Sequence, residues 1–217
     1  MSIGNGVKEP GSARLALSLA FAGFISGLAI IAIYEATLPT ITANKAEELR
    51  QAVFRVLPGV TRIRKFEPTP EGLKENPEAR GEEVVYGGYD PRGELVGYAI
   101  NSAGPGFQDT IRVLYGYVPA ERRVLGMWIL ESRETPGLGD KIYKDAEFVA
   151  NFEDLAIEPQ IVAVKKGTRS APNEIDAITG ATISSKAVAR IINEGHQRWK
   201  GRLPAPDGQP GIEEAEQ

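Results

Sequence analysis

The longest uninterrupted apolar stretch of the chain runs from Leu15 to Tyr34 and contains no charged residue. Its length matches the roughly 20 residues that a helix needs to cross a bilayer. A cleaved signal peptide is the alternative, but its apolar region usually spans only about 7–15 residues and ends at a small-residue cleavage site. We therefore predict an uncleaved transmembrane helix over residues 15–34.

The charges that flank this stretch predict its orientation. Lys8 and Arg14 precede the apolar run, and basic residues are enriched on the cytoplasmic side of membrane helices. We therefore expect a cytoplasmic N-terminus over residues 1–14 and an extracytoplasmic domain over residues 35–202. Residues 203–217 are rich in Pro, Gly and Glu, which predicts a disordered tail.

The pattern after the apolar stretch predicts an α+β domain with a mainly antiparallel sheet flanked by helices. Helical spacing over residues 43–57 ends at Pro58-Gly59, with a break expected near Pro39. Residues 64–83 are polar and contain three prolines, which predicts a loop. Runs typical of strands occupy residues 83–89, 95–101, 110–118, 123–131 and 161–165, and helical spacing recurs at 145–152 and from Ile183 to Trp199.

Composition then removes several classes of function. The net charge of −4 offers no basic surface for nucleic acid, and the absence of Cys excludes thiolate-bound metals and iron–sulfur clusters. The single histidine, His196, cannot form a multi-histidine site, so we predict no metal. We expect it either to face solvent or to lie at the C-terminal end of the last helix, where the dipole favours a cation. Any redox chemistry must come from an organic cofactor.

Two short segments carry the candidate chemistry. The first, from Glu134 to Gly139, follows a predicted strand and reads Glu-Thr-Pro-Gly-Leu-Gly. Pro136-Gly137 fits a type II turn, and Gly139 adds a second permissive position where backbone can approach a flat ligand. The second, from Asp176 to Thr182, reads Asp-Ala-Ile-Thr-Gly-Ala-Thr and places a hydroxyl one step before a helix.

The surroundings of Thr182 suit an anion. Ser184 or Ser185 is expected to cap the following helix, whose unpaired N–H groups and dipole favour a phosphate. Gly180 and Ala181 leave room for a bulky donor to reach the hydroxyl. The alternative is an ordinary turn that leads into a capped helix.

Together the two segments resemble the G subunit of the Rnf electron-transport complex and its relative, the C subunit of the sodium-pumping quinone reductase. The resemblance implies that a flavin transferase attaches FMN to Thr182 through a phosphoester, which would make the chain a flavoprotein with a phosphate-linked cofactor. The recognition sequence would then comprise Asp176, Thr179, Gly180, Ala181 and Thr182. The cofactor contacts implied are Glu134, Thr135, Gly137, Leu138, Gly139, Thr179, Gly180, Ala181, Ser184 and Ser185.

The same resemblance implies a redox subunit with no catalytic residue and no independent activity. The complex would couple electron transfer between ferredoxin and NAD to ion movement, and the chain would cross a bacterial inner membrane once, with membrane subunits and lipid as partners. Gly23 and Gly27, four residues apart, fit a helix-packing face. Two alternatives stay open: a flavin domain of a non-pumping extracytoplasmic pathway, and an anchored binding or assembly protein in which Thr182 is unmodified.

Overall fold

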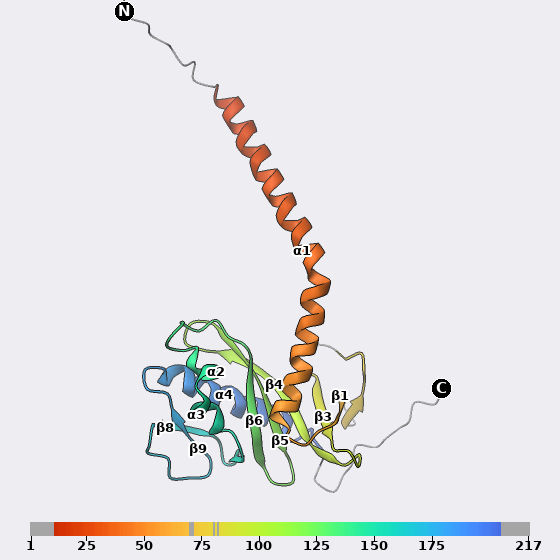
Figure 1. The fold of residues 1–217 in the computed structure, drawn as a ribbon, viewed down its shortest axis with the longest axis vertical. Coiled ribbons are helices and arrows are strands. Elements are labelled where there is room, and N and C mark those ends of the chain that lie inside the picture. The colour runs from red at the N-terminus through yellow and green to blue at the C-terminus, as the bar shows by residue number, and fades with distance from the viewer. Residues whose placement is uncertain (1–10, 70–71, 80, 82, 205–217) are drawn as a thin grey trace, which may run out of the picture. The chain divides into compact units, whose positions relative to one another are not determined.

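The computed structural model describes residues 11–69, 72–79, 81 and 83–204 (Figure 1). The chain divides into two compact units, residues 1–47 and 48–217. Helix α1 (Ser12–Val56) is 45 residues long, and the sheet and remaining helices belong to the second unit. Residues 1–10 and 205–217, which include most of the predicted cytoplasmic segment and tail, lie outside the described residues.

The N-terminal part of α1 is apolar and exposed. Within the described chain, α1 is the one helix long and apolar enough to cross a membrane, and large side chains such as Leu19 and Ile30 are 76% and 68% exposed. The expected break near Pro39 is wrong, because Pro39 lies inside α1. Proline removes one backbone donor, but the helix continues, and the Thr37 hydroxyl donates to the Ile33 carbonyl at 2.9 Å.

The predicted antiparallel meander is confirmed as the centre of a seven-stranded sheet with the order β2-β1-β3-β4-β5-β6-β7. Neighbouring strands of this sheet pair antiparallel. The bounds of β5 (Thr110–Val118) and β6 (Arg123–Glu131) agree with the prediction. The other strands are β1 (Arg62–Thr69), β2 (Gly72–Glu75), β3 (Val85–Tyr89), β4 (Leu95–Pro105) and β7 (Leu155–Ala156).

The proline-rich segment predicted as a loop is largely strand. β1 pairs with β3 through a register that places Phe66 opposite Val85. Phe66 is the one buried side chain of β1. The segment therefore lacks the alternation of apolar and polar residues by which a strand is recognised in a sequence. The local composition favours a loop, but β1 forms because its backbone pairs with the neighbouring strand β3.

Helices and a small second sheet complete the domain: α2 (Lys141–Lys144), α3 (Ala146–Ala150), β8 (Val162–Lys165), β9 (Glu174–Ala177) and α4 (Thr182–Trp199). Asp145 begins α3 by accepting the N–H groups of Glu147 and Phe148. β8 pairs with β9 in parallel. The sequence predicted β8 and not β9, whose four residues lead directly to the Thr182 turn.

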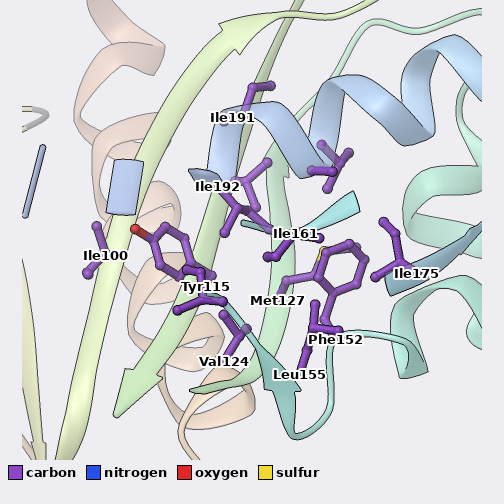
Figure 2. Packing of buried hydrophobic residues seen from close by; sticks show 14 of the residues in the cluster. Ile100, Tyr115, Val124, Met127, Phe152, Leu155, Ile161, Ile175, Ile191 and Ile192 are labelled. Carbon is purple, nitrogen blue, oxygen red and sulfur yellow. The ribbon is translucent and has the colours of Figure 1, made fainter. Parts of the chain in front are cut away.

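The sheet packs on both faces, and the alternation along β4 shows this directly. Tyr98 and Ile100 belong to the cluster that includes α4, whereas Ala99 between them belongs to the cluster with Val53 and Val56 at the end of α1. Figure 2 shows the first cluster, where side chains of the sheet meet Ile191 and Ile192 of α4, Ile175 of β9, and Ile161 just before β8. Tight packing of this kind fixes α4 along its length.

The expectation that His196 faces solvent is wrong. Its side chain is buried, and its ring makes an edge contact with Tyr117 at 4.9 Å between centroids. Neither ring nitrogen has a hydrogen-bond partner among the described residues, and burial lowers the pKa of the imidazole despite Glu158 nearby. Leu203, which the sequence placed in the tail, also packs in this core.

Candidate functional site

Two turns of similar construction form the centre of the site. In the first, the Leu138 N–H donates to the Thr135 carbonyl at 3.1 Å, and Gly137 has a φ of +80°. In the second, the Ala181 N–H donates to the Ile178 carbonyl at 3.0 Å, and Gly180 has a φ of +84°. A positive φ at the third residue is what a type II turn requires. The predicted turn at Pro136-Gly137 is confirmed.

The two turns lie next to each other. A Cβ added to Gly180 would come within 3.9 Å of Leu138 Cδ2. Gly139, which the sequence singled out for backbone freedom, is instead needed for close packing. A Cβ there would lie 2.6 Å from Glu134 Oε2 and 2.9 Å from Ser184 Oγ. The structure therefore brings the two predicted segments together.

Thr182 is the first residue of α4, with Ala181 at the N-cap position and no side-chain cap. The expectation of a serine cap is wrong, because Ser184 and Ser185 lie inside the first turn. The first backbone bond of α4 runs from the Ser185 N–H to the Ala181 carbonyl at 2.9 Å. The N–H groups of residues 182–184 consequently have no acceptor within the helix.

The hydroxyl groups of the two serines are used inside the protein. Ser185 Oγ accepts from the Ile178 N–H at 3.0 Å and donates to the Ala181 carbonyl at 2.9 Å. Ser184 Oγ donates to Glu134 Oε2 at 2.6 Å. Both side chains are buried. These hydroxyls hold the turn in place, and the Ser185 N–H is bonded to Ala181. Of the contacts to a phosphate predicted at these two positions, only the Ser184 N–H lacks an acceptor within the helix.

Glu134 is also buried, with 5% of its surface exposed. Oε1 accepts the backbone N–H groups of Phe107 and Gln108, each at 2.9 Å, and Oε2 accepts from Ser184. Burial alone raises the pKa of this carboxyl, but the hydrogen bonds from Ser184, Gln108 and Phe107 outweigh burial and hold the pKa below its ordinary value.

Thr182 differs from both serines in exposure and in bonding. Thr182 is exposed, and its hydroxyl reaches the Ile178 carbonyl only at 3.5 Å, the limit of a hydrogen bond. By contrast, the Thr135 hydroxyl donates to Gln108 Oε1 at 2.8 Å. Thr182 is thus an exposed residue with a weakly bonded hydroxyl, and it lies at the N-terminus of an 18-residue helix.

Three exposed apolar side chains lie on the segments that meet at this site. Leu138, Ile183 and Phe107 are 50%, 58% and 64% exposed. The sequence predicted Leu138 as a contact and missed Phe107, which follows Gly106 in the loop between β4 and β5. Its link to the site is the long-range bond from its N–H to Glu134, for which no local pattern gives a signal.

The remaining predicted residues lie around the second turn. Thr179 and Gly180 are exposed, whereas Ala181 is buried. Asp176 lies on β9, where its N–H donates to Asn151 Oδ1 at 3.0 Å and its carboxylate accepts the Gly167 N–H at 2.8 Å. A cleft of about 420 Å³ opens beside Thr179, and Lys141, Lys144 and Lys166 contribute to its lining. In the described part of the chain, no group of three His, Cys, Asp or Glu residues could hold a metal.

Comparisons with known proteins give the context of this geometry. Residues 106–197 match the FMN-binding domain family. The G subunit of the ion-translocating oxidoreductase complex of Cereibacter sphaeroides is 32% identical over 203 residues, which cover 88% of this chain and 86% of that one. The chain belongs to this G-subunit family.

Other members of the G-subunit family align less completely. The G subunit of the Na⁺-translocating ferredoxin:NAD⁺ oxidoreductase complex of Acetobacterium woodii is 38% identical over 113 residues. That alignment covers 50% of this chain and 51% of the relative, so it spans about half of each. The crystal structure of NqrC from Shewanella oneidensis has a TM-score of 0.60 at 18% identity and covers 74% of this chain and 98% of that one, which shows the same fold.

The match to the FMN-binding domain spans the whole site. Residues 106–197 include Phe107, both turns and α4 up to its last two residues. The G-subunit family and this domain support a redox subunit with a flavin, and α1 fits a single-pass membrane protein.

Proposed function

We propose that Thr182 carries FMN through a phosphoester and that the domain passes electrons within a membrane-bound oxidoreductase complex. The observation that carries this proposal is Thr182, an exposed residue whose hydroxyl is weakly bonded and which is the first residue of α4. It lies in a domain that matches the FMN-binding family. The neighbouring hydroxyls of Ser184 and Ser185 are buried and bonded, so Thr182 is the one of these three that is available for modification.

The N-terminus of α4 fits the phosphate of this linkage. The N–H groups of residues 182–184 have no acceptor in the helix, and the helix dipole favours an anion here. On attachment by a flavin transferase, a bond forms between Thr182 Oγ1 and the phosphorus of FMN. The donor is a flavin dinucleotide, whose diphosphate bond breaks at that phosphorus. The other half leaves as a nucleoside monophosphate, and the hydroxyl proton is released.

The apolar surfaces beside Thr182 fit the flat ring system. Leu138 and Phe107 present exposed side chains on two loops that the Glu134 carboxylate joins to α4. Around them, Thr135, Gly137, Gly139, Thr179 and Gly180 would offer backbone groups to the ring system. FMN supplies the capacity to accept and donate electrons, while these residues orient it and exclude water from one side.

The relatives suggest the wider reaction. The Acetobacterium woodii relative is a subunit of a Na⁺-translocating ferredoxin:NAD⁺ oxidoreductase complex. A further relative, from Clostridium ljungdahlii, is 30% identical over 171 residues, which cover 79% of this chain and 82% of that one, and is a subunit of a proton-translocating ferredoxin:NAD⁺ oxidoreductase complex. We place this chain in such a complex in a bacterial inner membrane, with residues 1–14 in the cytoplasm, residues 15–34 in lipid and residues 35–202 outside. Gly23 and Gly27 offer a packing face to other membrane subunits.

The test is in-gel fluorescence after denaturation. The full chain, produced with a flavin transferase, is expected to fluoresce on a denaturing gel, whereas Thr182→Val is expected to be dark. Thr135→Val is the matched control, because it removes a hydroxyl from the neighbouring turn and should stay fluorescent. A dark parent protein, or a fluorescent Thr182→Val protein, would contradict the proposal.

A further inference from the structure

Glu134 joins three segments that are distant in the sequence. Its carboxylate accepts two N–H groups from the loop between β4 and β5, and one hydroxyl from the first turn of α4. We call Glu134, the N–H groups of Phe107 and Gln108, and Ser184 Oγ the Glu134 clamp. No salt bridge to Glu134 occurs within the described residues. Such a buried carboxylate is tolerated because hydrogen bonds replace its hydration.

The space for this carboxylate is set by two glycines. A Cβ on Gly139 would lie 2.6 Å from Glu134 Oε2, and a Cβ on Gly106 would overlap Oε1. Carbon and oxygen atoms at those separations repel strongly, so each glycine leaves the volume that the carboxylate fills. The clamp is therefore built into the loops on both sides of it.

The clamp replaces the cap that α4 lacks. A side chain that caps a helix normally stabilises its first turn by about 1 kcal/mol. Ala181, at the N-cap of α4, provides no such hydrogen bond. Glu134 instead holds the first turn through Ser184, and its negative charge is favourable at this end of the helix. Because Glu134 bonds a hydroxyl rather than the backbone, it leaves the N–H groups of residues 182–184 without an acceptor within the helix.

We propose that Glu134 is a positioning residue that fixes the first turn of α4, and with it the Thr182 hydroxyl, in the geometry that accepts flavin. This inference rests on the proposed function of Thr182. It assigns Glu134 an internal role in place of the flavin contact that the sequence resemblance implied. Thr182 is two residues before Ser184, so fraying of this turn displaces the hydroxyl directly.

The test compares the initial rate of flavin attachment in full-length variants. Misplacing a reacting group by about 1 Å can slow a reaction on the order of a hundredfold, so Glu134→Ala is expected to slow attachment tenfold or more. Glu134→Gln should restore most of the rate, because its amide oxygen can accept both N–H groups and its NH₂ can donate to Ser184 Oγ. Glu174→Ala is the matched control, because Glu174 also accepts two loop N–H groups, from Ser170 and Ala171.

A double-mutant cycle tests whether the effect passes through Ser184. Ser184→Ala should slow attachment, and the Glu134→Ala, Ser184→Ala pair should be no slower than Glu134→Ala alone. Ser184→Ala is the milder change, because it removes one of the three hydrogen bonds to Glu134. If Glu134→Ala does not fold, the rate of Ser184→Ala alone tests the proposal. The positioning role of Glu134 would be contradicted if Glu134→Ala and Ser184→Ala both attached flavin at the parental rate. It would also be contradicted if the double variant lost the product of the two single losses, because the two residues would then act independently. In either case, fluorescence of the parent would still support attachment at Thr182. A parent without flavin would instead overturn the proposed function.

Discussion

The turns at residues 135–138 and 178–181 share a backbone design but end in different structures. Both have a glycine with positive φ at the third residue. The first leads through Gly139 into α2, which has four residues, whereas the second leads into the 18 residues of α4. A long helix places free N–H groups and a dipole at its start. The first turn is thus suited to line the site. The second is suited to present the hydroxyl to which a phosphate is attached.

The largest expected effect comes from distorting the second turn. Gly180 has a φ of +84°, and an L-residue there costs about 1–2 kcal/mol, most severely when β-branched. Gly180→Val is therefore expected to abolish flavin attachment, as measured by in-gel fluorescence, although Thr182 is unchanged. Gly180→Asn should retain part of the signal, because Asn tolerates this conformation. Full fluorescence of Gly180→Val would show that the shape of the turn is unimportant.

The equivalent change in the first turn should have a smaller and different effect. Gly137→Val imposes similar backbone strain, but the turn it alters carries no attachment residue. Covalent flavin should persist while the visible absorption spectrum shifts, because Leu138 moves relative to the ring. Gly167→Val is the matched control, since Gly167 has a φ of +80° in a loop after β8 and should leave the spectrum unchanged. Loss of attachment in Gly137→Val would contradict the division of roles.

The far end of α4 should show a modest pH dependence. Burial lowers the pKa of His196 from its ordinary 6.5, so the unfolded chain takes up a proton at a higher pH than the folded domain does. Stability is then complete above pH 6.5 and falls as the pH decreases below it. Denaturant unfolding at pH 8 and at about pH 5.5 should show this loss, and His196→Phe should reduce it. An equal loss in both proteins would assign the effect to other groups.

Local patterns were sufficient for strands β3, β4, β5, β6 and β8 and for helix α4. β6 largely alternates buried and less buried residues, β5 is a mostly buried run between turn residues, and α4 buries a stripe that includes Val188, Ile192 and Trp199. The turn at Pro136-Gly137 also follows from its two residues alone. In each case the physical information is contained within about ten neighbouring residues.

The missed features depend on contacts between distant residues. Glu134 meets Ser184 across 50 positions and Phe107 across 27, so neither partner is visible from the local sequence. β1 forms because β3 is beside it, although the prolines of residues 64–83 indicate a loop. His196 is polar but occupies a place on the buried stripe of α4. The local sequence therefore points to Thr182, whereas the contacts that hold its turn become visible only in the folded chain.

The most direct test of the account is peptide mapping by mass spectrometry on protein purified from membranes that contain a flavin transferase. The account predicts that the proteolytic peptide with Thr182 is heavier by one FMN less one water, and that fragmentation places this mass on Thr182. Peptides with Thr135, Ser184 or Ser185 should carry no such mass on those residues. An unmodified Thr182 peptide, or flavin on another residue, would contradict the central claim.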